Sequence, residues 1–164
     1  SILEEKSEVD LMELVATIIN VVSPPNHFSF QIKTTLPKII CEKTRFKQVF
    51  ENLITNAIKY NDKTSGYVTI DCTDSNDNWT FSVKDNGIGI DCKDLKRIFE
   101  LFASCTNSHH KDSTGIGLAI VKRNVDHWNG QVWAESIPGQ GSTFYFTYPK
   151  KTTNSHHNRE RETK

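Results

Sequence analysis

One amphipathic stretch, residues 45–60 (RFKQVFENLITNAIKY), constrains the fold of this 164-residue chain more than any other. Its apolar residues recur at the spacing of one helical face, which predicts a helix packed on a core. On the opposite flank, Asn52, Asn56 and Lys59 fall four and three residues apart, so they lie along one line of the helix surface. Amide oxygens and an ammonium group suit a hydrated Mg²⁺ ion and phosphates. For this helix alone, a solvated polar face that happens to hold two asparagines is an equal alternative.

Length and composition favour a single domain in a reducing compartment. The formal net charge is zero, so nothing marks the chain as a binder of nucleic acid. Its four cysteines form no C-x-x-C pair, which argues against a zinc site and a disulfide scaffold and favours the cytoplasm. No apolar run approaches the roughly 20 residues needed to span a bilayer, so we expect no membrane contact here. Because the sequence opens with Ser1, we expect a piece of a longer protein, in which any membrane anchor would lie elsewhere.

Two elements are expected before the central helix. Asp10 with Glu13 forms a capping-box pattern ahead of a helical apolar stripe that ends near Val22. Apolar and polar residues then alternate over 28–32, as in a half-buried strand. A short apolar run at 39–40 leads into the central helix, for which Glu42 or Thr44 could serve as the cap.

A hairpin is predicted after the central helix, with strands over 68–72 and 79–85. Asp85 follows Phe81 and Val83 at the spacing of a strand, so a carboxylate stands at the end of an apolar row. A buried carboxylate needs a hydrogen-bond donor, which a ligand could supply. Alternatively, Asp85 only caps the glycine turn that follows it.

Two Gly-x-Gly pairs flank a polar segment. Gly87 and Gly89 permit unusual torsions and close approach to the main chain, although they could also form a plain turn. Gly115 and Gly117 open a predicted helix, whose free amides would attract phosphate, although they could merely ease packing. Between the pairs we expect a short helix over 91–102 and a loop over 103–114, which is either a lid or an ordinary surface loop.

The last third of the chain reads as helix, strand, turn and strand. Gly130 is expected to end the helix, and two strands are predicted on either side of a turn at 138–141. Residues 150–164 contain no apolar residue that could order them, so we expect a disordered tail.

Taken together, these motifs occur in a recognisable order: the asparagine-bearing helix, DNGIGI, IFELF, TGIGLAI and GQGSTF. No P-loop or Rossmann fingerprint is present. The series resembles the N, G1, F, G2 and G3 boxes of the catalytic, ATP-binding domain of sensor histidine kinases, in the superfamily that also holds DNA gyrase, the MutL proteins and a heat-shock chaperone. The resemblance covers about residues 9–149, with residues 1–8 as a linker from a missing phosphoacceptor domain. It implies a two-layer α/β (α+β) sandwich of the Bergerat type, with a mixed sheet of about five strands and three to four helices on one face. The number of elements predicted above agrees with this fold.

The resemblance also implies roles for individual residues around Mg-ATP. Asn52 and Asn56 would hold Mg²⁺, and Lys59 would contact phosphate. Asp85 would accept a hydrogen bond from the adenine amino group. The remaining residues implied at the nucleotide are Tyr60, Gly87, Gly89, Lys111, Gly115, Gly117, Leu118 and Thr143. The loop 103–114 would be the ATP lid, in which Lys111 could meet the γ-phosphate.

Position 52 separates members of this superfamily. Gyrase-like ATPases have a glutamate there that acts as a general base, whereas an amide cannot take a proton at neutral pH. We therefore expect slow unaided hydrolysis of ATP and a histidine nucleophile from outside. None of the six histidines is followed by the pattern of a phosphoacceptor box. His109, His110 and Asp112 could suggest a metal site, but in a polar loop they are better explained as solvated side chains.

Two functions follow from this resemblance. The first is a kinase module that transfers the γ-phosphoryl group to a histidine on a separate dimerisation domain, from which a response regulator would receive it. The second is a non-catalytic module, in which ATP moves the lid and alters a protein contact. The intact boxes favour the first. We expect the fragment to be monomeric, unable to phosphorylate itself, and part of a homodimeric full-length protein.

Overall fold

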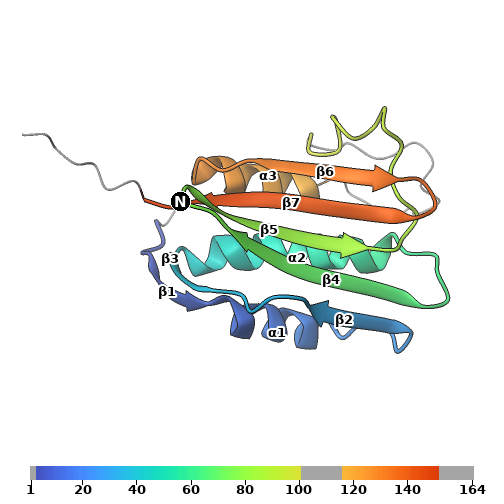
Figure 1. Ribbon diagram of the computed structural model, residues 1–164, viewed down its shortest axis with the longest axis horizontal. Coiled ribbons are helices and arrows are strands. Elements are labelled where there is room, and N and C mark those ends of the chain that lie inside the picture. Colours follow the sequence, from blue (N-terminus) through green and yellow to red (C-terminus); the bar gives the residue numbers. More distant parts are fainter. Residues whose placement is uncertain (1–2, 101–115, 152–164) are drawn as a thin grey trace, which may run out of the picture.

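The computed structural model describes residues 3–100 and 116–151. Figure 1 shows the order of the elements along the chain. Their bounds are β1 Ser7–Asp10, α1 Leu11–Val22, β2 Phe28–Ile32, β3 Lys38–Cys41, α2 Lys43–Lys59, β4 Gly66–Asp74, β5 Asn78–Asp85, α3 Gly117–His127, β6 Val132–Ile137 and β7 Gly141–Pro149.

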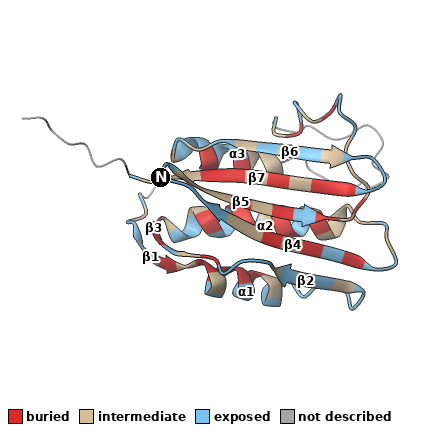
Figure 2. Ribbon diagram, viewed as in Figure 1, coloured by how far each residue is buried: buried red, intermediate tan, exposed pale blue. Residues whose placement is uncertain are grey.

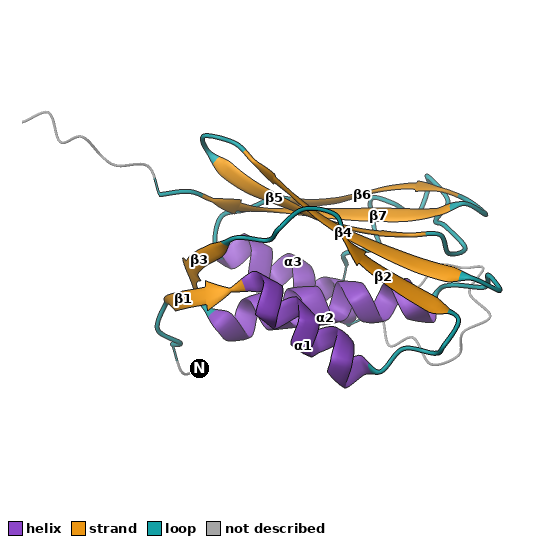
Figure 3. Ribbon diagram, turned by 60° about the horizontal axis from the view of Figure 1, so that its bottom comes forward, coloured by secondary structure: helices purple, strands orange, loops and turns teal. Residues whose placement is uncertain are grey.

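The described elements form two layers. The five-stranded sheet has the order β2-β4-β5-β7-β6, in which β2 and β4 are parallel and the other neighbours are antiparallel. The three helices lie together on one face of this sheet, with α2 between α1 and α3 (Figures 1 and 3). A separate small sheet pairs β1 with β3. The predicted α/β sandwich with a mixed sheet of about five strands is therefore confirmed.

The buried residues of the core come from the helices and from the strands of the sheet that they cover (Figure 2). Phe46 and Phe50 of α2 meet Phe81 of β5 and Phe146 of β7, with ring centroids 5.0–6.3 Å apart. All four rings are fully buried. Burying each phenylalanine contributes about 1.5–3 kcal/mol, so α2 is held firmly against the strand that ends at Asp85.

The two N-terminal helices are capped in different ways. Asp10 caps α1 as predicted, because its Oδ1 accepts from the Met12 and Glu13 amides at 3.0 and 3.3 Å. At α2, Glu42 occupies the cap position but its side chain makes no capping bond. The Thr44 amide instead donates to the carboxylate of Glu4, at 3.0 Å from Oε2. A residue 40 positions away thus supplies the acceptor that was expected locally.

The domain boundaries predicted at residues 9 and 149 remain predictions. β1 begins at Ser7, so pairing with β3 starts two residues before the first of them. Residues 152–164 of the predicted disordered tail lie outside the described residues. No helix of the described ranges is both long and apolar enough to cross a bilayer.

Two local predictions were wrong. Residues 91–100 form successive turns rather than a helix, because most of their bonds, such as those from the Asp94, Arg97 and Glu100 amides, span only three residues. The last two residues of that predicted helix are not described. After α3, Asn129 rather than Gly130 takes the left-handed conformation, with φ 58°. Gly130 is needed for a different reason: a Cβ atom there would clash with the Thr147 carbonyl oxygen.

Candidate functional site

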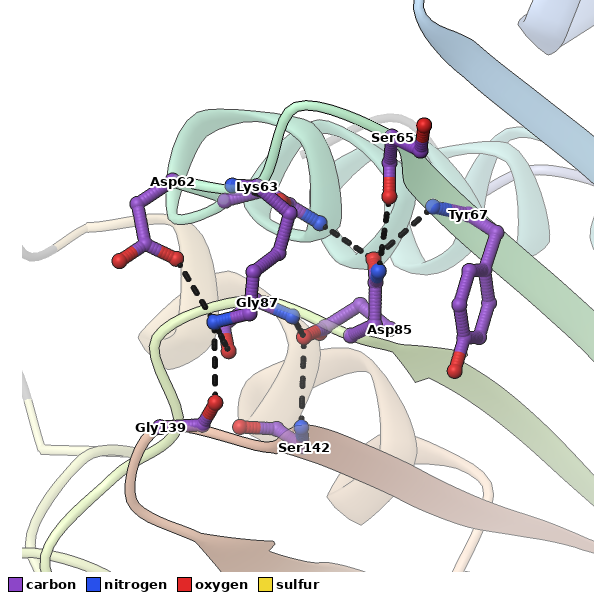
Figure 4. A network of polar contacts seen from close by, with 10 residues as sticks. Asp62, Lys63, Ser65, Tyr67, Asp85, Gly87, Gly139 and Ser142 are labelled. Carbon is purple, nitrogen blue, oxygen red and sulfur yellow. Dashed lines mark hydrogen bonds and ion pairs between the residues drawn. The ribbon is translucent and has the colours of Figure 1, made fainter.

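Asp85 stands at the end of β5 on the face that the helices cover. Its neighbours in phase, Phe81 and Val83, are fully buried, and Asp85 itself is only 7 % exposed. Its Oδ1 accepts from the Gly87 amide at 2.8 Å and from the Ser142 amide at 3.2 Å (Figure 4). Within the described ranges, both hydrogen bonds to this carboxylate end on Oδ1. The turn-capping alternative is thus correct for one oxygen, while Oδ2 is left for another donor.

The charge of Asp85 depends on two opposing effects. Burial raises the pKa of its carboxyl group from 3.8 to about 6, and the bonds from Gly87 and Ser142 oppose this rise. The group is therefore mainly ionised at neutral pH. A buried carboxylate with one oxygen unused by the described residues is suited to accept a hydrogen bond from an amino group of a ligand.

The glycines after Asp85 bring three chain segments into contact. A Cβ atom on Gly87 would clash with the Tyr60 carbonyl oxygen, to which the Ile88 amide donates at 3.0 Å. Gly89 has φ 72° and packs on the backbone of Ile137. The end of α2, the loop 86–90 and the β6–β7 turn therefore meet beside Asp85. This close approach goes beyond what a plain turn would require.

Lys63 completes this junction and was not predicted from the sequence. Its Nζ donates to the carbonyl oxygen of Gly139 at 2.9 Å and lies 3.5 Å from that of Gly87 (Figure 4). Asp62 pairs with the same ammonium at 3.0 Å. Lys63 therefore joins the loop after β5 to the turn before β7. Its partners are backbone carbonyls distant in the sequence, so no motif marked it.

Ser142, rather than Thr143, lies beside Asp85. Thr143 pairs with Lys84 on one side and Glu135 on the other, so strand alternation places it on the sheet face away from Asp85. Ser142 follows the opposite phase, and its hydroxyl lies 2.9 Å from that of Ser136. The place of Thr143 near the nucleotide stays a prediction, and its neighbour Ser142 is the residue at the start of β7 that bonds Asp85.

The asparagine flank of α2 faces the start of α3. Asn52 Nδ2 donates to the Gln48 carbonyl oxygen at 2.6 Å. Because a carbonyl can only accept, this bond sets the amide orientation and leaves Oδ1 pointing away from that bond. The position of a Cβ atom on Gly117 would lie 2.9 Å from this Oδ1. Asn52 thus presents an amide oxygen, a ligand type that Mg²⁺ accepts, beside a helix N-terminus, which attracts phosphate.

The other predicted residues that the structure describes lie at the end of α2 and at the start of α3. Asn56, Lys59 and Tyr60 are half-buried at the end of α2, where Lys59 Nζ lies 5.7 Å from the Tyr60 ring centroid. Leu118 packs against the core from the first turn of α3. Lys111, Gly115, the predicted lid and the histidine pair at 109–110 lie outside the described residues.

Comparison with known proteins decides the family. The family described as histidine kinase-, DNA gyrase B-, and HSP90-like ATPase (HATPase_c) matches residues 41–152, and this range contains Asn52, Asp85 and Gly117. The chain belongs to this ATPase family. It is therefore an ATP-binding domain, as the order of the five boxes predicted.

Its relatives in the family include a phytochrome-like protein and a sensor histidine kinase. It is 42 % identical over 115 residues to the phytochrome-like protein Cph1 of Synechocystis, a match that covers 70 % of this chain and 15 % of that protein. It is 40 % identical over 114 residues to the sensor histidine kinase WalK of Bacillus subtilis, covering 67 % and 18 %. The chain thus spans less than a fifth of either relative.

A solved structure agrees with the fold. The catalytic domain of histidine kinase ThkA, in a nucleotide-free form, superposes with a TM-score of 0.72 and 26 % identity. The match covers 89 % of this chain and 98 % of that domain. The two folds therefore agree over nearly the whole of that domain.

Proposed function

We propose that this HATPase_c domain binds Mg-ATP and transfers the γ-phosphoryl group to a histidine on a separate dimerisation domain. The observation that supports nucleotide binding most strongly is the buried Asp85 carboxylate, which the protein holds through one oxygen. The amino group of adenine is the donor that would pair with the other oxygen. Tyr60, Gly87 and Gly89 would border the purine at the junction of the three loops.

The phosphates would lie between α2 and the start of α3. Asn52 and Asn56 would hold Mg²⁺ through their amide oxygens, and bound Mg²⁺ would neutralise charge on the phosphates. Backbone amides at Gly115, Gly117 and Leu118 would bind phosphate oxygens, because helix N-termini carry unpaired N–H groups. Lys59 and Lys111 would supply positive charge. The orientation of Asn52 and its closeness to Gly117 support this arrangement.

The domain would act by placement and charge stabilisation rather than through a covalent intermediate. Asn52 stands where related ATPases have a base, and an amide does not deprotonate water at neutral pH. An imidazole needs little activation, so a histidine supplied by another domain is the fitting acceptor. The proposal extends to a homodimeric, cytoplasmically facing full-length kinase and a response regulator that receives the phosphate.

Phosphotransfer to a separately produced phosphoacceptor domain tests this proposal. With ATP labelled at the γ-phosphate, we expect acid-labile, alkali-stable label on the acceptor, as phosphohistidine gives. Asp85→Asn and omission of Mg²⁺ should each remove it. Tight ATP binding without any label would contradict transfer and support the nucleotide-gated module instead.

A further inference from the structure

A buried asparagine joins α3 to α2 at some distance from the predicted nucleotide contacts. Asn124 is 3 % exposed and lies in the second half of α3. Its Oδ1 accepts from Arg45 Nη1 at 2.9 Å, and its Nδ2 donates to Gln48 Oε1 at 2.9 Å. Both partners belong to the first half of α2. A buried amide paired through donor and acceptor at once allows little sliding of one helix along the other.

The same two helices meet again at the asparagine flank. Gln48, which accepts from Asn124 through its side chain, also accepts from Asn52 through its backbone carbonyl. Asn52 Oδ1 in turn lies against Gly117, seven residues before Asn124. Seven residues make about two turns of an α-helix, a length of about 10 Å. A shift of α3 at Asn124 is therefore carried to Gly117.

Arg45, which donates to Asn124, also forms an ion pair with Glu42. Its Nε lies 2.6 Å from Glu42 Oε2, while Glu42 Oε1 lies 3.0 Å from His127 Nε2 at the end of α3. The guanidinium is thus fixed between Glu42 and Asn124. The chain of contacts runs from the last turn of α3 through α2 to Asn52.

We infer that Asn124 is a positioning residue: by bonding Arg45 and Gln48, it sets the spacing between Asn52 and the start of α3, and so the affinity for the triphosphate part of ATP. The inference rests on the proposed function, since it deepens the account of the same site. The purine end is built by β5, β7, their loops and Tyr60 at the far end of α2, whereas Asn124 bonds the first half of α2. Loss of Asn124 should therefore weaken ATP binding and spare adenosine binding.

The first experiment needs no nucleotide. Asn124→Leu replaces the amide with an apolar side chain of similar size and so removes both hydrogen bonds. Hydrogen exchange at the Ile120 amide, which bonds the Ile116 carbonyl oxygen at 2.9 Å, should speed up about tenfold in this variant. Ile18→Ala is the matched control, because it weakens the core on the α1 side of α2. Exchange at Ile120 that is unchanged in Asn124→Leu, or raised equally in the control, would overturn the inference.

The second experiment compares two ligands by calorimetry or NMR titration. In Asn124→Leu we expect ATP affinity to fall about tenfold while adenosine affinity stays within about twofold, since a tenfold change corresponds to about 1.4 kcal/mol at one end of the site. In Ile18→Ala the ratio of the two affinities should match that of the wild type. Equal losses for both ligands, or none, would overturn the positioning role. A wild-type chain that binds neither ligand would instead contradict the proposed function, and the exchange experiment would still decide whether Asn124 fixes α3.

Discussion

The purine end and the triphosphate end of the proposed site are built in different ways. At the purine end, Asp85, Gly87 and Ser142 are joined by hydrogen bonds within a buried junction of strands and turns. At the triphosphate end, Asn52 and Gly117 come from two helices whose spacing depends on side chains further along them. The first end is therefore fixed by bonds within the site itself, whereas the geometry of the second depends on contacts outside it, such as those of Asn124.

This difference has an energetic consequence. A group that is already oriented needs no ordering when the ligand binds, so its contacts contribute nearly their full free energy to affinity. Contacts that depend on the spacing of two helices contribute less to the binding free energy when that spacing is not already set. We therefore expect changes at the purine end to affect every adenine ligand, and changes at the triphosphate end to affect only phosphorylated ligands.

The largest effect is expected from Asp85→Asn. The new side chain can still accept from Gly87 and Ser142 through its oxygen, so its NH₂ group would face the adenine amino group and two donors would meet. We expect ATP affinity to fall about 100-fold or more, because a mispaired buried group is costly. Calorimetry measures the loss, and circular dichroism should show an intact fold. Asp91→Asn, an exposed carboxylate in the next loop, is the control and should bind normally.

Lowering the pH should weaken the same contact. The pKa of Asp85 is raised to about 6, so its charged form falls from most of the population at pH 7 to about a tenth at pH 5. Adenosine affinity should fall about tenfold over this range. Asp85→Asn should show no such dependence. A flat profile in the wild type would contradict the role of the ionised carboxylate.

The stability of the nucleotide-free chain should follow the same titration. The folded-state pKa of Asp85 lies above its unfolded value, so the folded form holds the proton more tightly. This contribution to stability is fully present below about pH 4 and is lost as the pH rises through about 6. Urea unfolding of the wild type and of Asp85→Asn, over the range from about pH 4 to above pH 6, would measure this contribution. The variant should lack it.

Asn56→Ala should separate the two ends. We expect it to weaken ATP binding about tenfold when Mg²⁺ is present and to leave binding nearly unchanged when the ion is chelated, because it removes one oxygen from the ion. Adenosine affinity should not change. Thr55→Ala, the exposed neighbour on α2, serves as the control. An equal loss for adenosine would mean that the two ends are not independent.

The smallest effect is expected from Lys63→Met. This change removes the ammonium that joins the Gly87 and Gly139 carbonyls and keeps most of the aliphatic stem. ATP and adenosine affinities should fall together by about threefold, the size expected for one partly exposed hydrogen-bonded contact. Lys84→Met, an exposed lysine on β5, should leave both unchanged. A loss confined to ATP would assign Lys63 to the phosphates instead.

The sequence predicted the parts of the site that depend on local periodicity. Strand alternation placed Asp85 in the core, and helical spacing placed Asn52, Asn56 and Lys59 on one flank of α2. Contacts that arise only on folding were missed. Lys63 binds backbone carbonyls, Glu4 caps a helix 40 residues away, and no spacing rule detects such partners.

The two local errors have simple physical causes. The segment after Gly89 has an apolar spacing compatible with a helix, yet its tight three-residue bonds produce turns. After α3, Asn129 rather than Gly130 takes the left-handed conformation, because asparagine tolerates a positive φ better than most residues. Both errors lie next to a glycine, where torsions are least predictable from neighbours.

The most direct test compares ATP with inosine triphosphate, in which an oxygen replaces the adenine amino group, on the wild type and on Asp85→Asn. If the Asp85 carboxylate accepts from that amino group, the wild type should prefer ATP by about 100-fold, because two acceptors would face each other in the inosine complex. The variant should lose this preference or reverse it, since its NH₂ group can donate to the oxygen. The same preference in both proteins would contradict the account, because the purine would then be recognised elsewhere.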